Sequence, residues 1–194
     1  MKLLLASEFP NVFNRAKHLF PKSDKNLVTI INTASIGEGF ELDYDSEIKP
    51  FEDLCYDVEL FDLSSRGGVI EQLEKSDIFY VAGGNTFFLL EHMNKSGFKK
   101  CLSNDFLYIG SSAGSVIMSP DINFISPMDE KEKANLDSTK GLNQIWFAFL
   151  PHIGHETMGD AAKEIQKNYK ADVPLFSFTD DQAIYINDNQ IEIL

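Results

Sequence analysis

The residues best suited to chemistry in this chain lie in a short glycine–serine turn at positions 110–114. Its sequence, Gly-Ser-Ser-Ala-Gly, follows the apolar run 107–109 and precedes another apolar segment. This is the G-x-S-x-G pattern of a nucleophile elbow, in which a strained serine needs nearly side-chain-free neighbours two residues away. By register that serine is Ser112, although Ser111 and Ser115 flank it. The same pattern also occurs in tight turns that have no catalytic role. Whether Ser112 is catalytic therefore depends on the other residues of the chain.

A serine hydroxyl needs a base, and two of the four histidines lie where a base is expected. His152 and His155 follow residues 145–151, an apolar run that we predict to be a buried strand. Working sites in open α/β sheets lie at the carboxyl ends of the strands, which makes His152 a candidate general base for Ser112. A purely structural histidine at a strand end is the alternative. The other two histidines fall within predicted helices.

A second glycine-rich turn runs from position 81 to 86, with the sequence Val-Ala-Gly-Gly-Asn-Thr. A strand that leads into two glycines and a helix permits close approach of a ligand to the backbone, and free N–H groups near a helix start suit an anion. Asn85 is equally explained as an ordinary helix N-cap after a glycine turn. Both interpretations stay open at this point.

A serine–histidine pair also needs an acid that orients the histidine. The candidates near the turn and the histidine are Asp121, Asp129, Glu130 and Glu156, and spacing does not choose among them. A metal is the competing use of residues 152–156, His-Ile-Gly-His-Glu. Their order is not the H-E-x-x-H of a zinc-binding helix, and no third ligand set stands out. We therefore expect neither a metal nor another cofactor.

Composition limits the classes of protein that this chain can be. It has 194 residues, 43% hydrophobic residues and a formal charge of −13, which predicts one domain spanning 1–194 and argues against nucleic acid or anionic membrane as a partner. Two cysteines give no disulfide framework. The apolar run at the N-terminus is too short for a signal peptide, and no segment reaches the length of a membrane span. We expect a cytoplasmic protein.

The elements that must position these residues alternate between apolar runs and helix-length segments. The predicted strands cover residues 2–6, 27–33, 58–63, 78–82 and 107–110, and the predicted helices cover residues 12–20, 46–56, 68–76 and 85–96. This alternation predicts an α/β fold, a three-layer sandwich around a mostly parallel, doubly wound sheet. Short strands at 174–178, 183–187 and 190–194 follow, with a hairpin turn at 188–189. The polar stretch 120–141 is either a functional lid or a solvated loop.

Four ordered motifs give the chain a resemblance to a known family. They are residues 81–86, residues 109–114, Leu150-Pro151-His152, and residues 179–183 with the sequence Thr-Asp-Asp-Gln-Ala. Together they resemble the dipeptidase E, or aspartyl dipeptidase, family of serine peptidases, relatives of cyanophycinase. The resemblance covers most of the chain and implies a class I glutamine amidotransferase-like fold.

The resemblance implies roles for four residues of this sequence. Ser112 matches the nucleophile of the family, and His152 matches its general base. The backbone N–H groups of Gly84 and Ala113 match the oxyanion hole. The resemblance thus assigns catalysis to the two motifs that the residue types already pointed to.

The triad acid and the substrate contacts follow less directly from the resemblance. The family's aspartate lies about fifteen residues after the serine, which makes Asp129 the nearest match, and relatives that look as though they use a glutamate keep Glu156 as the alternative. Aspartyl-specific members carry an arginine where this chain has Met158. A thioether cannot pair with a carboxylate as arginine does. We expect Asn85 and Met158 to contact a substrate that is not strictly aspartyl.

We therefore expect a serine hydrolase that cleaves dipeptides or other short peptides through a Ser-His-acid triad and an acyl-enzyme, as a monomer or homodimer. One alternative is an amidase or esterase on the same triad. Another is a catalytically inactive family member that acts as a binding protein. Labelling of Ser112 by a fluorophosphonate would separate an activated serine from an inert one.

Overall fold

A seven-stranded sheet in the order β3-β2-β4-β5-β1-β8-β9 forms the centre of the computed structural model, which describes residues 2–22, 25–65, 67–102, 106–187 and 190–194. Its strands are β1 (Lys2–Ala6), β2 (Leu27–Ile31), β3 (Asp57–Phe61), β4 (Ile78–Val81), β5 (Leu107–Ser111), β8 (Ala183–Asn187) and β9 (Gln190–Ile193). The strands from β3 to β1 pair in parallel, whereas β8 and β9 are antiparallel. The expected hairpin turn at 188–189 lies outside the described residues.

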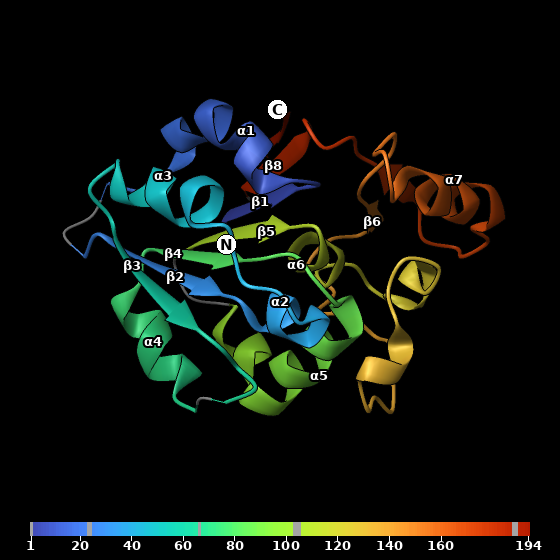
Figure 1. Cartoon of the computed structure of the whole chain (residues 1–194), viewed down its shortest axis with the longest axis horizontal. Helices are drawn as coiled ribbons and strands as arrows, with labels where there is room; N and C mark the ends of the chain where they lie inside the picture. The colour runs from blue at the N-terminus through green and yellow to red at the C-terminus, as the bar shows by residue number, and fades with distance from the viewer. Residues whose placement is uncertain (1, 23–24, 66, 103–105, 188–189) are drawn as a thin grey trace.

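Helices cover both faces of this sheet, which confirms the predicted α/β sandwich (Figure 1). On one face lie α1 (Phe9–Ala16) and α3 (Lys49–Glu52), and on the other lie α2 (Thr33–Glu38), α4 (Val69–Lys75) and α5 (Thr86–Ser96). The helix expected at 46–56 is instead a π-helical turn, Tyr44–Ile48, followed by the short α3. The helix expected at 12–20 begins earlier, with Pro10 in its first turn, where a missing N–H costs nothing.

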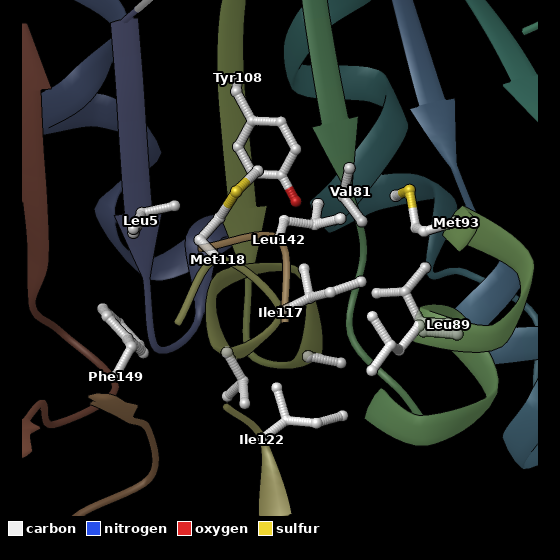
Figure 2. Packing of buried hydrophobic residues seen from close by; sticks show 14 of the residues in the cluster. Leu5, Val81, Leu89, Met93, Tyr108, Ile117, Met118, Ile122, Leu142 and Phe149 are labelled. Carbon is white, nitrogen blue, oxygen red and sulfur yellow. The ribbon is translucent and has the colours of Figure 1, made fainter. Parts of the chain in front are cut away.

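The two faces of the sheet pack differently. On the face of α1 and α3, Phe9 and Phe51 contact Tyr80, and their rings are stacked at 5.9 Å between centroids. Phe13 and Phe20 pack against these two rings. The other face carries a larger, mainly aliphatic cluster, part of which Figure 2 shows. Both clusters hold the central strands rigidly, so that the ends of β4 and β5 provide a firm base for a site.

A separate two-stranded parallel sheet contains β6 (Ala148–Leu150) and β7 (Leu175–Ser177), with Leu150 opposite Ser177. Both were expected as strands, and helix α7 (Gly159–Asn168) lies between them in the chain. Backbone hydrogen bonds continue this pairing beyond the strands, from Phe178 N to Leu150 O at 2.9 Å and from Ile153 N to Phe178 O at 3.0 Å. Parallel pairing places the carboxyl ends of β6 and β7 side by side.

The polar stretch 120–141 has little regular structure but is anchored to α5. It contains the 3₁₀ turns η4 (Asn123–Ile125) and η5 (Lys131–Lys133). Asn135 N donates to the Glu91 carboxylate at 2.8 Å, and Lys133 forms a 2.6 Å ion pair with Glu38. No helix within the described ranges is long and apolar enough to cross a bilayer.

Candidate active site

Ser112 occupies a strained turn between β5 and the short helix α6 (Ala113–Val116). Its φ of 48° and ψ of −111° are unusual for a residue with a side chain. The Ser112 N–H donates to the carbonyls of Ala6 at 3.1 Å and Ser7 at 3.0 Å, at the end of β1. These bonds to a neighbouring strand stabilise the strained conformation. The geometry is that of a nucleophile elbow.

The glycines on either side of Ser112 are required by close backbone contacts. A Cβ on Gly110 would lie 2.6 Å from the carbonyl oxygen of Gly114, and a Cβ on Gly114 would lie 2.1 Å from that of Val81. No side chain fits at such distances. The G-x-S-x-G spacing therefore reflects the tight packing of the turn onto β4 and β5.

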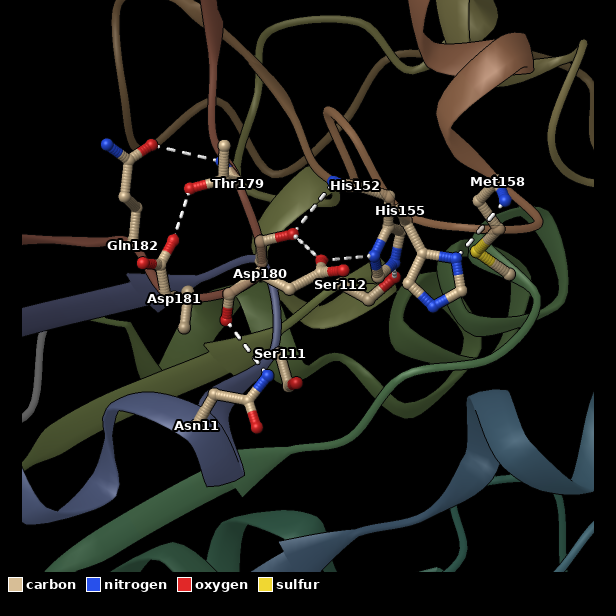
Figure 3. Close-up of polar contacts among 12 residues, drawn as sticks. Asn11, Ser111, Ser112, His152, His155, Met158, Thr179, Asp180, Asp181 and Gln182 are labelled. Carbon is tan, nitrogen blue, oxygen red and sulfur yellow. Dashed lines mark hydrogen bonds and ion pairs between the residues drawn. The ribbon is translucent and has the colours of Figure 1, made fainter.

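A continuous hydrogen-bond chain runs from Ser112 through His152 to Asp180 (Figure 3). Ser112 Oγ lies 2.8 Å from His152 Nε2, and His152 Nδ1 lies 2.7 Å from Asp180 Oδ1. The imidazole is buried, with 4% of His152 exposed. A carboxylate at Nδ1 favours the tautomer whose Nε2 is free to accept the serine proton. This arrangement can activate a serine hydroxyl for attack on a carbonyl carbon.

The small parallel sheet brings His152 and Asp180 together. His152 lies two residues beyond the end of β6, and Asp180 lies three residues beyond the end of β7. Because these strands are parallel neighbours, both side chains emerge at the same edge, facing the end of β5. Asp180 was not among the candidate acids named from the sequence. Its motif, Thr-Asp-Asp-Gln-Ala at 179–183, contributed to the family resemblance and was the signal that could have found it.

Ser7 connects this pair to the main sheet and was missed by sequence reasoning. Its hydroxyl accepts a hydrogen bond from His152 N at 2.8 Å and donates to Asp180 Oδ1 at 2.7 Å. Ser7 is fully buried, directly after β1. Asn11, in α1, donates to the Asp180 carbonyl at 3.3 Å. Ser7 therefore fixes both the backbone of the histidine and the carboxylate that orients its ring.

The two acids expected to orient His152 lie elsewhere. Asp129 Oδ2 accepts from the backbone N–H of Thr86 at 2.9 Å, at the first residue of α5. Glu156 is exposed in the turn before α7. Closeness in sequence made both residues candidates and the family resemblance selected them, whereas the contact with His152 Nδ1 depends on the pairing of β6 with β7. Burial raises the pKa of Asp129 above its ordinary value.

Gly84 lines the same cavities as Ser112, and Ala113 follows Ser112 directly at the start of α6. Their role as oxyanion donors stays a prediction. In the described part of the chain, neither amide donates a hydrogen bond to a backbone carbonyl. Gly84 adopts a φ of 129°, and a Cβ there would lie 2.2 Å from the Ala34 carbonyl oxygen. Ala113 is the first residue of α6, whose N–H has no partner within the helix. Both amides are thus free to stabilise developing negative charge.

Asn85 and Met158 differ in their access to this site. Asn85 is fully buried and caps α5, because its Oδ1 accepts from Phe88 N at 2.9 Å. Its Nδ2 donates to Glu38 and to the Glu130 carbonyl, both at 3.0 Å. Met158 is 41% exposed and lines the space around Ser112. The structure thus uses Asn85 for capping and leaves Met158 available to a ligand.

Two cavities meet at Ser112 and His152. One, of about 220 Å³, extends toward α5 and the polar stretch 120–141. The other, of about 190 Å³, extends toward α1 and the π-helical turn. Phe40 and Met158 line both of them. The polar stretch contributes Ile125, Met128, Asp129 and Glu130 to the first cavity, so it forms part of the wall around Ser112.

In the part of the chain that the structure describes, the ligand atoms of Glu8, His152 and Asp180 lie within 4.8 Å of one another. These residue types can hold a metal ion. Both ring nitrogens of His152, however, already lie at hydrogen-bond distance from Ser112 and Asp180. The expectation that the site needs no metal therefore stays a prediction.

Comparisons with known proteins agree on one family. Residues 7–194 match the model of Peptidase family S51. The chain is 34% identical to Uncharacterized peptidase Lmo0363 of Listeria monocytogenes over 200 residues, which cover 97% of this chain and 96% of that protein. It is 32% identical to Uncharacterized peptidase PM1590 of Pasteurella multocida over 200 residues, which cover 100% of this chain and 96% of that protein.

Solved structures show the same fold. A 1.5 Å crystal structure of a Listeria monocytogenes protein named for peptidase E matches with a TM-score of 0.90 at 32% identity, and the match covers 100% of this chain and 97% of that one. A peptidase from an acI-B1 actinobacterium matches with a TM-score of 0.67 at 15% identity, covering 100% and 86%. The second likeness concerns the fold alone.

Proposed function

The chain belongs to peptidase family S51, and from that membership we propose that it hydrolyses dipeptides or other short peptides with Ser112 as its nucleophile. Membership confirms the resemblance to dipeptidase E-like serine peptidases, and the protein is a peptidase. The observation that carries the proposal is the hydrogen-bond chain from Ser112 Oγ through His152 to Asp180, with distances of 2.8 and 2.7 Å.

In the proposed reaction, His152 Nε2 takes the proton of Ser112 Oγ as this oxygen attacks the scissile carbonyl carbon. The amides of Gly84 and Ala113 stabilise the resulting oxyanion. When the C–N bond breaks, the imidazolium gives its proton to the leaving amine, and an acyl-enzyme on Ser112 remains. A water molecule, deprotonated by His152, then attacks the ester carbonyl and releases the acid.

Asp180 is the orienting acid of this proposal, in place of Asp129 and Glu156. Its carboxylate faces His152 Nδ1 and stabilises the imidazolium that forms in each step. Ser7 holds the same carboxylate oxygen and the histidine backbone. The acid thus comes from the loop after β7 and not from the loop that follows the nucleophile.

The size and lining of the site favour short substrates. The two cavities that meet at Ser112 and His152 measure only about 220 and 190 Å³, and together they lie near the lower end of the roughly 300–1,000 Å³ of pockets for drug-sized ligands. Among the described residues, their linings contain carboxylates but no lysine or arginine. With Met158 in place of an arginine, the described lining offers no guanidinium or ammonium to pair with an aspartyl side chain. We propose that neutral or basic peptides such as Ala-Leu are cleaved in preference to Asp-Leu.

The first experiment is to label the protein with a fluorophosphonate and to replace Ser112 with alanine. Labelling and peptide hydrolysis should both disappear in Ser112→Ala. The matched control is Ser115→Ala, which removes a neighbouring hydroxyl that donates to the Ala6 carbonyl at 2.8 Å. The Ser115→Ala variant should still react with the fluorophosphonate at Ser112. Thermal unfolding checks that this variant keeps its fold. Hydrolysis that persists in Ser112→Ala would contradict the proposal.

The same label tests the two alternatives. An inactive family member that only binds peptides would not react, because only an activated serine attacks the probe. An amidase or esterase would react, and a panel of dipeptides, simple amides and short esters separates it from a peptidase. The acyl-enzyme step is common to all three classes, so only the choice of substrate separates them. We expect the highest kcat/KM for a dipeptide, because the chain belongs to a peptidase family.

A further inference from the structure

The cavity of about 190 Å³ beside Ser112 is lined by two carboxylates that the proposed reaction does not use. Glu8 follows β1 and precedes α1, and Glu47 lies in the π-helical turn Tyr44–Ile48. The same cavity reaches the nucleophile Ser112 and its base His152. A group bound by these carboxylates would therefore lie next to the scissile bond.

Glu8 lines the cavity beside Ser112, although its position before α1 would suit it to cap that helix. It occupies the N-cap position of α1, yet its side chain makes no capping hydrogen bond. The N–H of Phe9 donates instead to Ser111 Oγ at 3.0 Å. A carboxylate oxygen of Glu8 lies within 4.8 Å of the ligand atoms of His152 and Asp180. Burial raises the pKa of this carboxyl, and His152 partly counteracts the rise.

Glu47 has a carboxylate oxygen with no partner. Its Oε1 accepts from the Tyr80 hydroxyl at 3.3 Å, whereas its Oε2 is buried and makes no hydrogen bond to any described residue. Burial, with a smaller contribution from the charge of Glu8, raises the pKa of Glu47 to about 7. An unsatisfied buried carboxylate oxygen is costly, which is why such groups are normally paired.

Among the described residues that line this cavity, no lysine or arginine faces the two carboxylates. His152 and His155 are the only nitrogen bases of this described lining. His155 Nδ1 accepts hydrogen bonds from the backbone N–H groups of Thr157 and Met158 at 3.1 and 3.2 Å. The cavity is therefore built for a positive charge that the chain does not itself supply.

We propose that Glu8 and Glu47 form a subsite for a cationic group of the peptide substrate, an ammonium or a guanidinium. The inference rests on the proposed function, since it names the substrate class of that site. The cation would face the side chains of Glu8 and Glu47 that line this cavity, while Phe40 and Met158, exposed by 50% and 41%, would cover the apolar part of the substrate. The group is either the α-ammonium of the peptide or a basic side chain.

Matched substrates separate these two sources. Lys-Leu is compared with norleucyl-leucine, and Ala-Lys with alanyl-norleucine, because each pair differs only by a side-chain ammonium. Ala-Leu is compared with acetyl-Ala-Leu to test the α-ammonium. In the wild-type protein we expect at least one cationic member to have a kcat/KM about 10- to 100-fold higher than its partner, as charge-assisted hydrogen bonds predict.

The variants Glu8→Gln and Glu47→Gln keep the size of each side chain but remove its charge. Each should reduce the ratio of kcat/KM between cationic and neutral members by about tenfold, mainly through KM. The matched control Glu74→Gln removes one charge from the exposed face of α4 and should leave the ratio as it is in the wild type.

The outcomes keep this inference separate from the proposed function. A ratio near one for all pairs in the wild type, with hydrolysis that still requires Ser112, overturns the cation subsite and leaves the peptidase proposal standing. Equal loss of the ratio in Glu74→Gln also overturns it, because long-range attraction would then explain the preference. Absence of any Ser112-dependent hydrolysis overturns both.

Discussion

The carboxylates around Ser112 lie in two regions that differ in how many hydrogen bonds the negative charge receives. Behind His152, the Asp180 carboxylate is engaged by the imidazole and by the hydroxyl of Ser7. In the two cavity walls, Asp129 and Glu47 have fewer partners, and burial raises the pKa of both. Closeness to the nucleophile therefore does not by itself place an acid against the base. Of these acids, Asp180 is the one hydrogen-bonded to His152 Nδ1.

The strongest test of this difference is to replace one acid in each region with its amide. We expect Asp180→Asn to lower kcat by about 10³- to 10⁴-fold, because an amide at Nδ1 no longer stabilises the imidazolium and favours the wrong tautomer. Asp129→Asn should lower kcat by less than about tenfold, since its oxygen still accepts from Thr86 N. The measurement is steady-state hydrolysis of Ala-Leu by both variants.

A larger loss of kcat in Asp129→Asn than in Asp180→Asn would reverse the assignment and restore the acid that the sequence favoured. Thermal unfolding of each variant serves as the control, because a loss of activity counts only in protein that remains folded. Fluorophosphonate labelling rates give a second readout, which does not depend on the choice of peptide.

The sequence was sufficient for the parts of the site that depend on local geometry. The turn around Ser112 could be predicted because the spacing of its glycines reflects the steric limits of the backbone. The strands 78–82 and 107–110 could be predicted because short apolar runs are typical of buried strands. His152 could be predicted from its position after a strand. Predicting these elements needs only the local sequence and the general rule that sites lie at the carboxyl ends of strands.

The rest depends on which strands pair. Asp180 is 28 residues from His152 in the chain, and Ser7 is 145 residues away. Their contact follows from β6 pairing with β7 and from β1 lying beside β5, which a single sequence does not reveal. The motif at 179–183 was visible, but only the strand pairing explains why its first aspartate, and not Asp129, meets the histidine.

The second prediction concerns the cavity wall at Glu47. Because burial raises its pKa to about 7 from an ordinary 4.5, the carboxyl contributes stability below pH 4.5 that is lost as the pH rises through 7. The free energy of unfolding of wild type, relative to Glu47→Gln, should therefore fall by about 3 kcal/mol between pH 4 and pH 8. Urea unfolding of both proteins at several pH values measures it.

The control for this titration is Glu74→Gln, whose stability should follow that of the wild type at every pH. Parallel curves for wild type and Glu47→Gln would show that the Glu47 carboxylate is not penalised in the folded protein, and the contrast with Asp180 would then disappear. A bound cationic peptide should reduce the difference at pH 8, because it supplies the missing counter-charge.

The smallest expected effect tests whether Asp129 is a capping residue. Asp129→Ala removes the acceptor for Thr86 N at the start of α5 and should lower the free energy of unfolding by about 1 kcal/mol. Asp129→Asn keeps an acceptor and removes a charge that burial disfavours, so at pH 8 it should be at least as stable as the wild type. Urea unfolding distinguishes the two. Equal destabilisation by both variants would mean that the charge itself is needed, and Asp129 would then belong with Asp180 rather than with the cavity walls.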